Sequence, residues 1–423
     1  MAMESYQKNQ LANGISVVTE AVPSLDSVSI GIWIKTGSRD EVPAECGLSH
    51  FIEHLLFKGT ERRSAFDISR EIESVGGSIN AFTGKEYTCF HAKILKRDIA
   101  LAVDILADII AHSAFALPEI ERERMVVLQE IKMVEDTPDD YIHDLFHRCF
   151  WGDHPLGYPI TGLEENVSSF RREEIIAFVQ DHYTPGRMIV AAAGGLNHGA
   201  VVDLVSARLG ELRPWPAPAP RQETSGSRSR MQITHRDLEQ VHFCLGTTGI
   251  AHHHRLRYAG HTLNTILGGN MSSRLFQEVR EKRGLTYSIY SFLNMYTDTG
   301  LFGVYAGTTK AEIEEVITLI VQELQGIREG RIEEADLTAA KEYLRGGTIL
   351  SLEGSDGRMS RVARDEICFG RHIPLAEVLD GLERITKGDI VEIAQEMLDS
   401  HPLCITLLGA IEERDLPWQT VEL

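Results

Sequence analysis

The order of expected strands and helices before residue 213 starts again after residue 230, and this internal repeat constrains the fold more than any other feature. Between the halves, residues 213–230 hold four prolines followed by a segment rich in serine and glycine. Proline makes a linker stiff and extended, whereas serine and glycine make it flexible. Because 423 residues exceed one ordinary domain, we predict tandem homologous domains at 1–212 and 231–423.

Hydrophobic periodicity predicts the class of each half. Alternating apolar residues indicate strands, and an apolar repeat of three to four residues indicates helices. In the first half these patterns predict strands at 15–22, 27–36, within 78–94 and at 188–193, and helices at 66–75, 98–112, after Pro118 and at 173–182. In the second half they predict strands at 240–247, 287–292, 301–306 and 403–408, and helices at 257–267, 311–325 and 379–399. Antiparallel strands in blocks, separated by paired helices, favour an α+β fold. We therefore expect two α/β rolls, each an antiparallel sheet packed against helices.

The stretch from Gly47 to Phe57 contains the pattern His50-x-x-Glu53-His54, which is the inverted form of the zinc-peptidase motif. In a helix, residues four apart leave the same face about one turn apart. Both imidazoles can therefore reach one Zn²⁺, at about 2.0–2.1 Å each. Glu53 lies beside that face without being a ligand, where its carboxylate can take a proton from metal-bound water.

The internal repeat tests this pattern. A shift of 211 residues places His261 opposite His50, but Asn264 opposite Glu53 and Thr265 opposite His54. The second copy thus lacks the base and one ligand. We expect one zinc ion per chain, bound by the first half.

A catalytic zinc usually has three protein ligands and one open position. Candidates for the third are four acids on the helix after Pro118: Glu119, Glu121, Glu123 and Glu130. Glu123 and Glu130 are seven residues apart and share a helix face, which fits one ligand and one supporting carboxylate. Spacing alone does not choose between these acids, and a charged solvent-facing helix has the same pattern.

Two other histidine groups compete with this site. His143 and His147 are also four residues apart, with Asp144 beside the first, but no carboxylate pair is clearly presented to them. We expect them to be packed or surface residues. The run from His252 to His254 is expected in an exposed loop, where it could bind metal adventitiously.

Charge and composition exclude several classes of protein. The chain has 42 basic and 62 acidic residues, for a formal net charge of −20. This balance disfavours nucleic acid as a partner and is compatible with basic peptides. The chain has no apolar run of about 18 residues, so no membrane span is predicted. The polar start, 1–10, shows no signal peptide.

The six cysteines form no C-x-x-C pair. We expect them to be core residues of a reduced, cytoplasmic protein.

These motifs resemble the pitrilysin, insulysin and mitochondrial processing peptidase family of zinc metallopeptidases, most of all its short members, such as the processing peptidase β-subunit and its bacterial relatives. The resemblance covers nearly the whole chain. In that family the third zinc ligand is a glutamate about 76 residues after the second histidine, which implies Glu130 here. The family also has a second glutamate seven residues earlier, so the resemblance implies a catalytic role for Glu123.

The resemblance also implies how substrate is held. The segment Gly76-Gly77-Ser78-Ile79-Asn80-Ala81 matches an edge strand that pairs with extended peptide, so Gly77, Asn80 and Ala81 are expected to contact substrate. In the second half, Arg280 and Tyr287 match a pair that binds the scissile peptide and its oxyanion. Full-length relatives enclose substrate in a chamber of four such domains.

The resemblance therefore implies that this chain dimerises, with Arg280 and Tyr287 acting on the partner's zinc. The expected function is a zinc metalloendopeptidase that cleaves peptides or unfolded, presequence-like segments inside a homodimeric chamber. The alternative is a non-catalytic scaffold or peptide-binding relative of the same fold.

Overall fold

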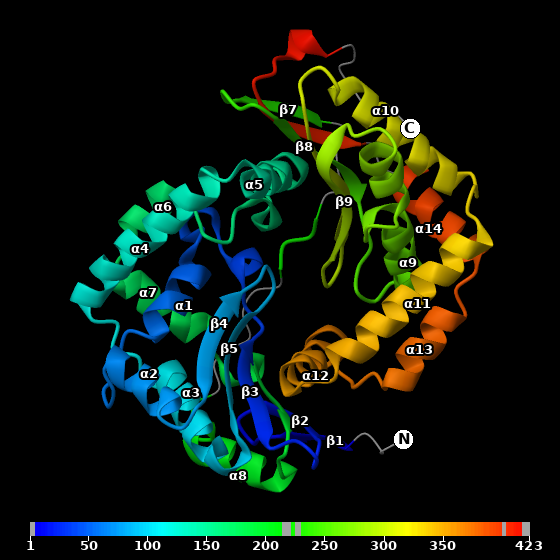
Figure 1. Ribbon diagram of the computed structural model, residues 1–423. Coiled ribbons are helices and arrows are strands. Elements are labelled where there is room, and N and C mark those ends of the chain that lie inside the picture. Colours follow the sequence, from blue (N-terminus) through cyan, green and yellow to red (C-terminus); the bar gives the residue numbers. More distant parts are fainter. Residues whose placement is uncertain (1–4, 214–220, 225–229, 400–402, 417–423) are drawn as a thin grey trace. The chain divides into compact units, whose positions relative to one another are not determined.

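The computed structural model describes residues 5–213, 221–224, 230–399 and 403–416, and these form two compact units (Figure 1). Unit 1 takes residues 1–132, 158–221 and 349–374, and unit 2 takes 133–157, 222–348 and 375–423. Each sheet therefore draws its helices from both halves of the sequence.

Unit 1 is built on a six-stranded sheet with the order β1-β2-β6-β3-β5-β4. The strands are β1 (Ser5–Gln10), β2 (Ser16–Ala21), β3 (Ser27–Ile34), β4 (Ser78–Thr83), β5 (Thr88–Leu95) and β6 (Met188–Gly194). Neighbouring strands are antiparallel except β2 and β6, which are parallel. Strand β4 is at one edge of this sheet, so its outer backbone groups have no strand partner among the described residues of unit 1.

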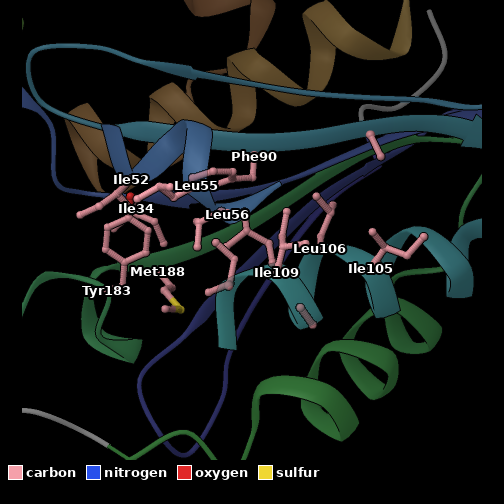
Figure 2. Close-up of a cluster of buried hydrophobic side chains, with 14 of the residues drawn as sticks. Ile34, Ile52, Leu55, Leu56, Phe90, Ile105, Leu106, Ile109, Tyr183 and Met188 are labelled. Atoms are coloured by element: carbon pink, nitrogen blue, oxygen red, sulfur yellow. The ribbon is translucent and has the colours of Figure 1, made fainter. Parts of the chain in front are cut away.

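Helices cover both faces of this sheet. They are α1 (Leu48–Leu56), α2 (Ala65–Glu73), α3 (Ile99–Ala111), most of α4 (Leu117–Glu135), α6 (Glu164–Ser169), α7 (Arg172–His182), α8 (His198–Leu209) and α12 (Ser355–Phe369). On one face, Leu55 and Leu56 of α1 meet Leu106 and Ile109 of α3 in the main core, where Phe90 of β5 also lies (Figure 2). Burying a side chain of this size contributes about 1.5–3 kcal/mol.

Strand alternation explains how the second face is covered. Along β6, Val190 and Ala192 belong to the main core, whereas Ile189 and Ala191 point to the other face and pack with Val362 of α12. All residues of β6 are buried, which is why its sequence is apolar without alternation. Sheet 1 thus needs α12, although α12 lies in the second half of the chain.

Unit 2 repeats this plan. Its sheet has the order β7-β11-β8-β10-β9, with β7 and β11 parallel and the other pairs antiparallel. The strands are β7 (Arg230–His235), β8 (Val241–Thr248), β9 (Thr286–Met295), β10 (Gly300–Thr308) and β11 (Cys404–Gly409). The helices are α5 (Pro138–Trp151), α9 (Arg257–Gly268), α10 (Ile313–Arg328), most of α11 (Glu334–Ser351), α13 (Leu375–Glu383) and α14 (Lys387–Asp399), with a π-helix at Phe276–Glu281.

The second sheet borrows a helix in the same way. Ile405 and Leu407 of β11 face the large core of unit 2, whereas Cys404 and Leu408 face the other side and pack with Phe146 of α5. Helix α5 comes from the first half of the chain. The exchange of α5 and α12 follows because each sheet is apolar on both faces and needs a helix on each.

The two tandem α/β folds expected from the repeat are confirmed, because the five strands β2-β6-β3-β5-β4 match β7-β11-β8-β10-β9 in order and direction. The compact units nevertheless differ from the expected division at 1–212 and 231–423, owing to the exchanged helices. Most of the expected linker, 213–230, lies outside the described residues.

One expected helix is wrong in extent. The span 379–399 was expected to be a single helix, but α13 ends at Glu383 and α14 begins at Lys387. Thr386 causes this break, because its hydroxyl oxygen accepts a hydrogen bond from the Asp389 N–H, as a helix N-cap does. In the part of the chain that the structure describes, no helix combines the length and apolar character needed to cross a membrane.

Candidate metal centre

Helix α1 carries the histidine motif, and buried contacts hold its N-terminal end. Gly47, just before the helix, has φ +95, and a Cβ there would lie 2.5 Å from the Gly162 backbone, so only glycine fits. The buried Glu41 carboxylate accepts the N–H groups of Gly47 and Ser49 at 2.8 and 2.7 Å, which caps the helix. Burial raises the pKa of Glu41 to about 8, against the lowering effect of these hydrogen bonds.

The two motif histidines lie on one face of α1, with ring centroids 4.7 Å apart. His50 Nε2 is 3.7 Å from Glu130 Oε1, and His54 Nε2 is 3.5 Å from Glu130 Oε2. These separations exceed hydrogen-bond length. They match the roughly 3.3 Å between ligand atoms that surround Zn²⁺ tetrahedrally with bonds of about 2.0–2.1 Å. The donor set therefore fits a divalent metal of the zinc type.

Among the described residues, these three side chains are the one group of at least three candidate ligands whose donor atoms all lie within 4.8 Å of one another. Burial, together with a smaller contribution from the charge of His54, lowers the pKa of His50 to about 4. A neutral imidazole is the form that binds metal. Burial thus keeps His50 ready to bind metal at neutral pH.

Helix α4 brings both Glu123 and Glu130 to the two motif histidines. Glu130 faces the two imidazoles. Glu123 lies two turns earlier, and its Oε2 is 3.2 Å from His54 Nδ1. Glu119 and Glu121, the other candidates, pair instead with arginines of their own helix. An Nδ1–H donated to Glu123 leaves the His54 Nε2 lone pair aimed toward Glu130 and any bound metal.

Glu53 lies beside the ligand face, as the spacing predicts. Its Oε2 accepts a short hydrogen bond from the Thr83 hydroxyl at the end of β4. Burial raises the pKa of Glu53 above its ordinary value, and the hydrogen bond from Thr83 acts in the opposite direction. A carboxylate with a raised pKa is a better proton acceptor, which suits a general base.

The expected substrate strand is the exposed edge of sheet 1. Within β4, Asn80 is exposed and Ala81 is half-buried, and Asn80 Oδ1 accepts the Ala81 N–H at 2.9 Å. Gly77 precedes the strand, and a Cβ there would lie 3.0 Å from the Lys93 carbonyl oxygen. Because β4 also packs against α1, a peptide added to this edge would run beside the metal centre.

In unit 2, Arg280 and Tyr287 lie together. The Arg280 guanidinium is 5.0 Å from the Tyr287 ring centroid and 4.6 Å from that of Phe276. Arg280 belongs to the π-helix Phe276–Glu281, and such irregular turns are frequent at functional sites. Tyr287 is 78% exposed. The structure brings this pair together, and its role on substrate stays a prediction.

The competing histidines have other partners. His143 Nε2 bonds to the Tyr290 hydroxyl at 2.7 Å, and His147 Nδ1 donates to the His143 carbonyl oxygen of its own helix at 2.8 Å. The two rings therefore do not share a ligand position. In the triple-histidine segment, His254 Nε2 pairs with Glu396 at 3.2 Å.

Three residues that support the candidate site are not predicted from the sequence. They are the Glu41 cap, the Thr83 hydroxyl and Lys58, whose Nζ lies 2.7 Å from Glu123 Oε1. Thr83 and Lys58 reach residues on elements far away in the chain, so no local spacing identifies them. Glu41 reaches Gly47 and Ser49 across an irregular loop, which has no periodic pattern that would predict the contact.

Two family models and several curated proteins match this chain. Residues 16–163 match the family described as insulinase, peptidase family M16, and residues 169–344 match its inactive domain. The chain is 40% identical to an uncharacterized zinc protease of Streptomyces coelicolor, over 97% of this chain and 91% of the relative. It is 41% identical to one of Mycobacterium tuberculosis, over 98% and 95%, and 39% identical to YmxG of Bacillus subtilis, an uncharacterized zinc protease, over 91% and 94%.

Solved structures show the same fold. A protease from Helicobacter pylori superimposes with a TM-score of 0.88 at 22% identity, covering 96% of this chain and 99% of the other. A peptidase M16 inactive domain from Pseudomonas fluorescens gives a TM-score of 0.87 at 19% identity, covering 96% and 98%.

Proposed function

Because the chain belongs to the insulinase (M16) peptidase family, we propose that it is a zinc-dependent metalloendopeptidase. The observation that carries the proposal is the meeting of two imidazoles and one carboxylate, from His50, His54 and Glu130, with the Glu53 carboxylate beside them. Its substrates are peptides or unfolded, presequence-like segments. The net charge of −20 favours basic ones.

His50, His54 and Glu130 would hold one Zn²⁺ per chain. Zinc supplies Lewis acidity there, which polarises a peptide carbonyl and makes water easier to deprotonate. Glu53 accepts the proton of the attacking water on its carboxylate and later delivers it to the leaving amine. Asn80, Ala81 and the preceding Gly77 hold the peptide in extended form along β4. Arg280 and Tyr287 donate hydrogen bonds to the oxyanion.

We propose further that the enzyme works as a homodimer in the cytoplasm. Each chain has two homologous folds but one cluster of zinc-ligand type among its described residues. A pair of chains would supply the four domains of a chamber, in which the partner subunit's Arg280 and the partner subunit's Tyr287 serve the zinc. All six cysteines are free, which is compatible with a reducing compartment.

Digestion of a random peptide mixture tests the activity. The purified protein is expected to cut internal peptide bonds. Its cleavage activity should disappear after dialysis against a chelator and return when one equivalent of Zn²⁺ is added. Sequencing the products by mass spectrometry gives the cleavage preference. A protein that binds no zinc and cuts nothing would instead be the non-catalytic, peptide-binding relative.

Mixed dimers test the shared site. Glu53→Gln chains lack the base and Tyr287→Phe chains lack a hydroxyl that binds the oxyanion, so each homodimer is expected to be nearly inactive. In a mixed dimer, one site combines an intact Glu53 with an intact Tyr287 of the other chain. Mixing after subunit exchange should therefore restore activity, up to about a quarter of wild type if chains pair randomly. An inactive mixture, with mixed dimers verified by differential tags, would mean that the site is not shared.

A further inference from the structure

The Glu123 carboxylate is almost fully buried and contacts both the His54 imidazole and the Lys58 ammonium. Its side chain is 4% exposed, with Oε2 lying 3.2 Å from His54 Nδ1 and Oε1 lying 2.7 Å from Lys58 Nζ. A buried carboxylate needs a partner for each oxygen, because an unpaired buried charge is costly. Lys58 therefore neutralises a buried carboxylate, which an exposed surface ion pair does not do.

Lys58 reaches Glu123 from the segment that leaves α1. The helix ends at Leu56, and the Lys58 N–H bonds to the Leu55 carbonyl at 3.0 Å, which keeps Lys58 in a last turn. Lys58 follows His54 by four positions, so both side chains come off the same side of the chain, one turn apart. The two therefore contact opposite oxygens of one carboxylate.

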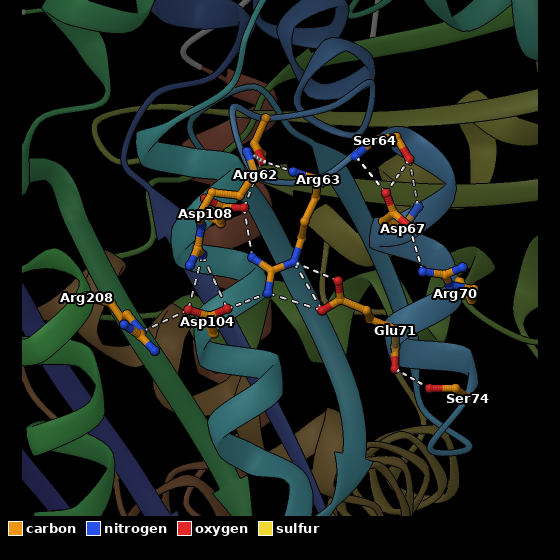
Figure 3. A network of polar contacts seen from close by, with 11 residues as sticks. Arg62, Arg63, Ser64, Asp67, Arg70, Glu71, Ser74, Asp104, Asp108 and Arg208 are labelled. Carbon is orange, nitrogen blue, oxygen red and sulfur yellow. Dashed lines mark hydrogen bonds and ion pairs between the residues drawn. The ribbon is translucent and has the colours of Figure 1, made fainter.

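A network of ion pairs holds the segment after Lys58 (Figure 3). Arg63 contacts Asp108 at 2.9 Å and Asp104 at 2.5 Å, and Arg62 contacts Asp108 at 3.0 Å, so two arginines bind two aspartates of α3. The Thr60 hydroxyl donates to Asp108 at 2.8 Å. The Asp108 side chain is fully buried. This network ties residues 60–63 to α3 and so fixes the backbone from which Lys58 extends.

Resting on the function proposed above, we propose that Lys58 is a positioning residue of the metal centre. Its ammonium holds the Glu123 carboxylate in the orientation that accepts the His54 Nδ1–H. That hydrogen bond leaves His54 Nε2 as the metal-binding nitrogen and fixes the plane of the ring. Lys58 thus acts on zinc affinity through Glu123 without touching zinc or substrate.

Zinc affinity of the full-length chain, measured by competition with a chromophoric chelator, tests the proposal. Lys58→Met is expected to weaken Zn²⁺ binding about 10-fold, the low end of the 10- to 100-fold range for groups that orient ligands. Lys58→Arg should recover most of the loss, since it keeps the charge. The matched control is Lys96→Met, which breaks an exposed ion pair with Asp26 and should leave zinc affinity unchanged.

A double-mutant cycle separates this role from general stabilisation. Glu123→Gln removes the carboxylate, and in that background Lys58→Met should cause no further loss of zinc affinity. An unchanged affinity in Lys58→Met, or an equal loss in both backgrounds, would overturn the proposal. If Lys58→Met does not fold by circular dichroism, Lys58→Gln takes its place in the cycle. A wild-type chain that binds no zinc would instead refute the proposed function, and the role of Lys58 with it.

Discussion

Replacing Glu53 with glutamine is expected to leave zinc bound and to slow peptide cleavage by about 10²- to 10⁴-fold, the usual contribution of a general base. Glutamine has the same shape, and its amide oxygen can still accept the hydrogen bond from Thr83. It cannot take a proton from water. Because Glu53 is not one of the three clustered ligands, the metal should remain.

The measurement compares cleavage of a quenched fluorescent peptide with zinc content determined on the same samples. Glu73→Gln is the matched control, since Glu73 is an exposed acid on the neighbouring helix α2 and should be fully replaceable. Full activity of Glu53→Gln would remove Glu53 from the mechanism. Loss of zinc in the same variant would show that Glu53 supports the metal rather than the proton transfer.

Replacing Glu130 with glutamine is expected to abolish stable zinc binding and, with it, cleavage. The carboxylate is the one negative charge among the three clustered groups, and its two oxygens lie 3.7 and 3.5 Å from the two imidazoles. A neutral amide is a much weaker ligand for zinc. Because groups that merely orient ligands already contribute about 10- to 100-fold, losing a ligand should cost more than about 100-fold in affinity.

Chelator competition measures this loss directly. Glu121→Gln is the control on the same helix, because Glu121 is two-thirds exposed and pairs with Arg124 rather than with the histidines. That variant should bind zinc as the wild type does. Wild-type affinity in Glu130→Gln would mean that another residue completes the metal centre.

Local periodicity accounted for most of the architecture. The spacing of His50 and His54 on one helix face and the repeated order of strands are set by short stretches of chain, so both could be predicted. Periodicity predicts one helix over 379–399, whereas the Thr386 cap divides this apolar pattern into two helices. It also missed the exchange of α5 and α12, since an apolar helix does not reveal which sheet it covers.

The choice of the acid that meets the two imidazoles shows most clearly what spacing cannot predict. Spacing pairs Glu123 with Glu130 on one helix face but does not choose the ligand among Glu119, Glu121, Glu123 and Glu130, and only the resemblance to a known family favours one of them. The fold separates them, because it turns Glu130 toward both imidazoles and Glu123 toward one His54 nitrogen, while the other two pair with arginines.

The sequence by itself determined the helix that bears two imidazoles and a carboxylate, because these residues are a few positions apart. It also determined the duplication of the fold, because each strand and helix of the repeat has its own local pattern and the order of these patterns recurs. Only the tertiary structure decided which carboxylate meets the imidazoles, and that Glu41, Thr83 and Lys58 support the site. The contacts of Glu130, Thr83 and Lys58 join separate elements, and the packing that brings them together has no signature in any single stretch of chain. The contact of Glu41 depends on the path of an irregular loop, which no periodic pattern predicts.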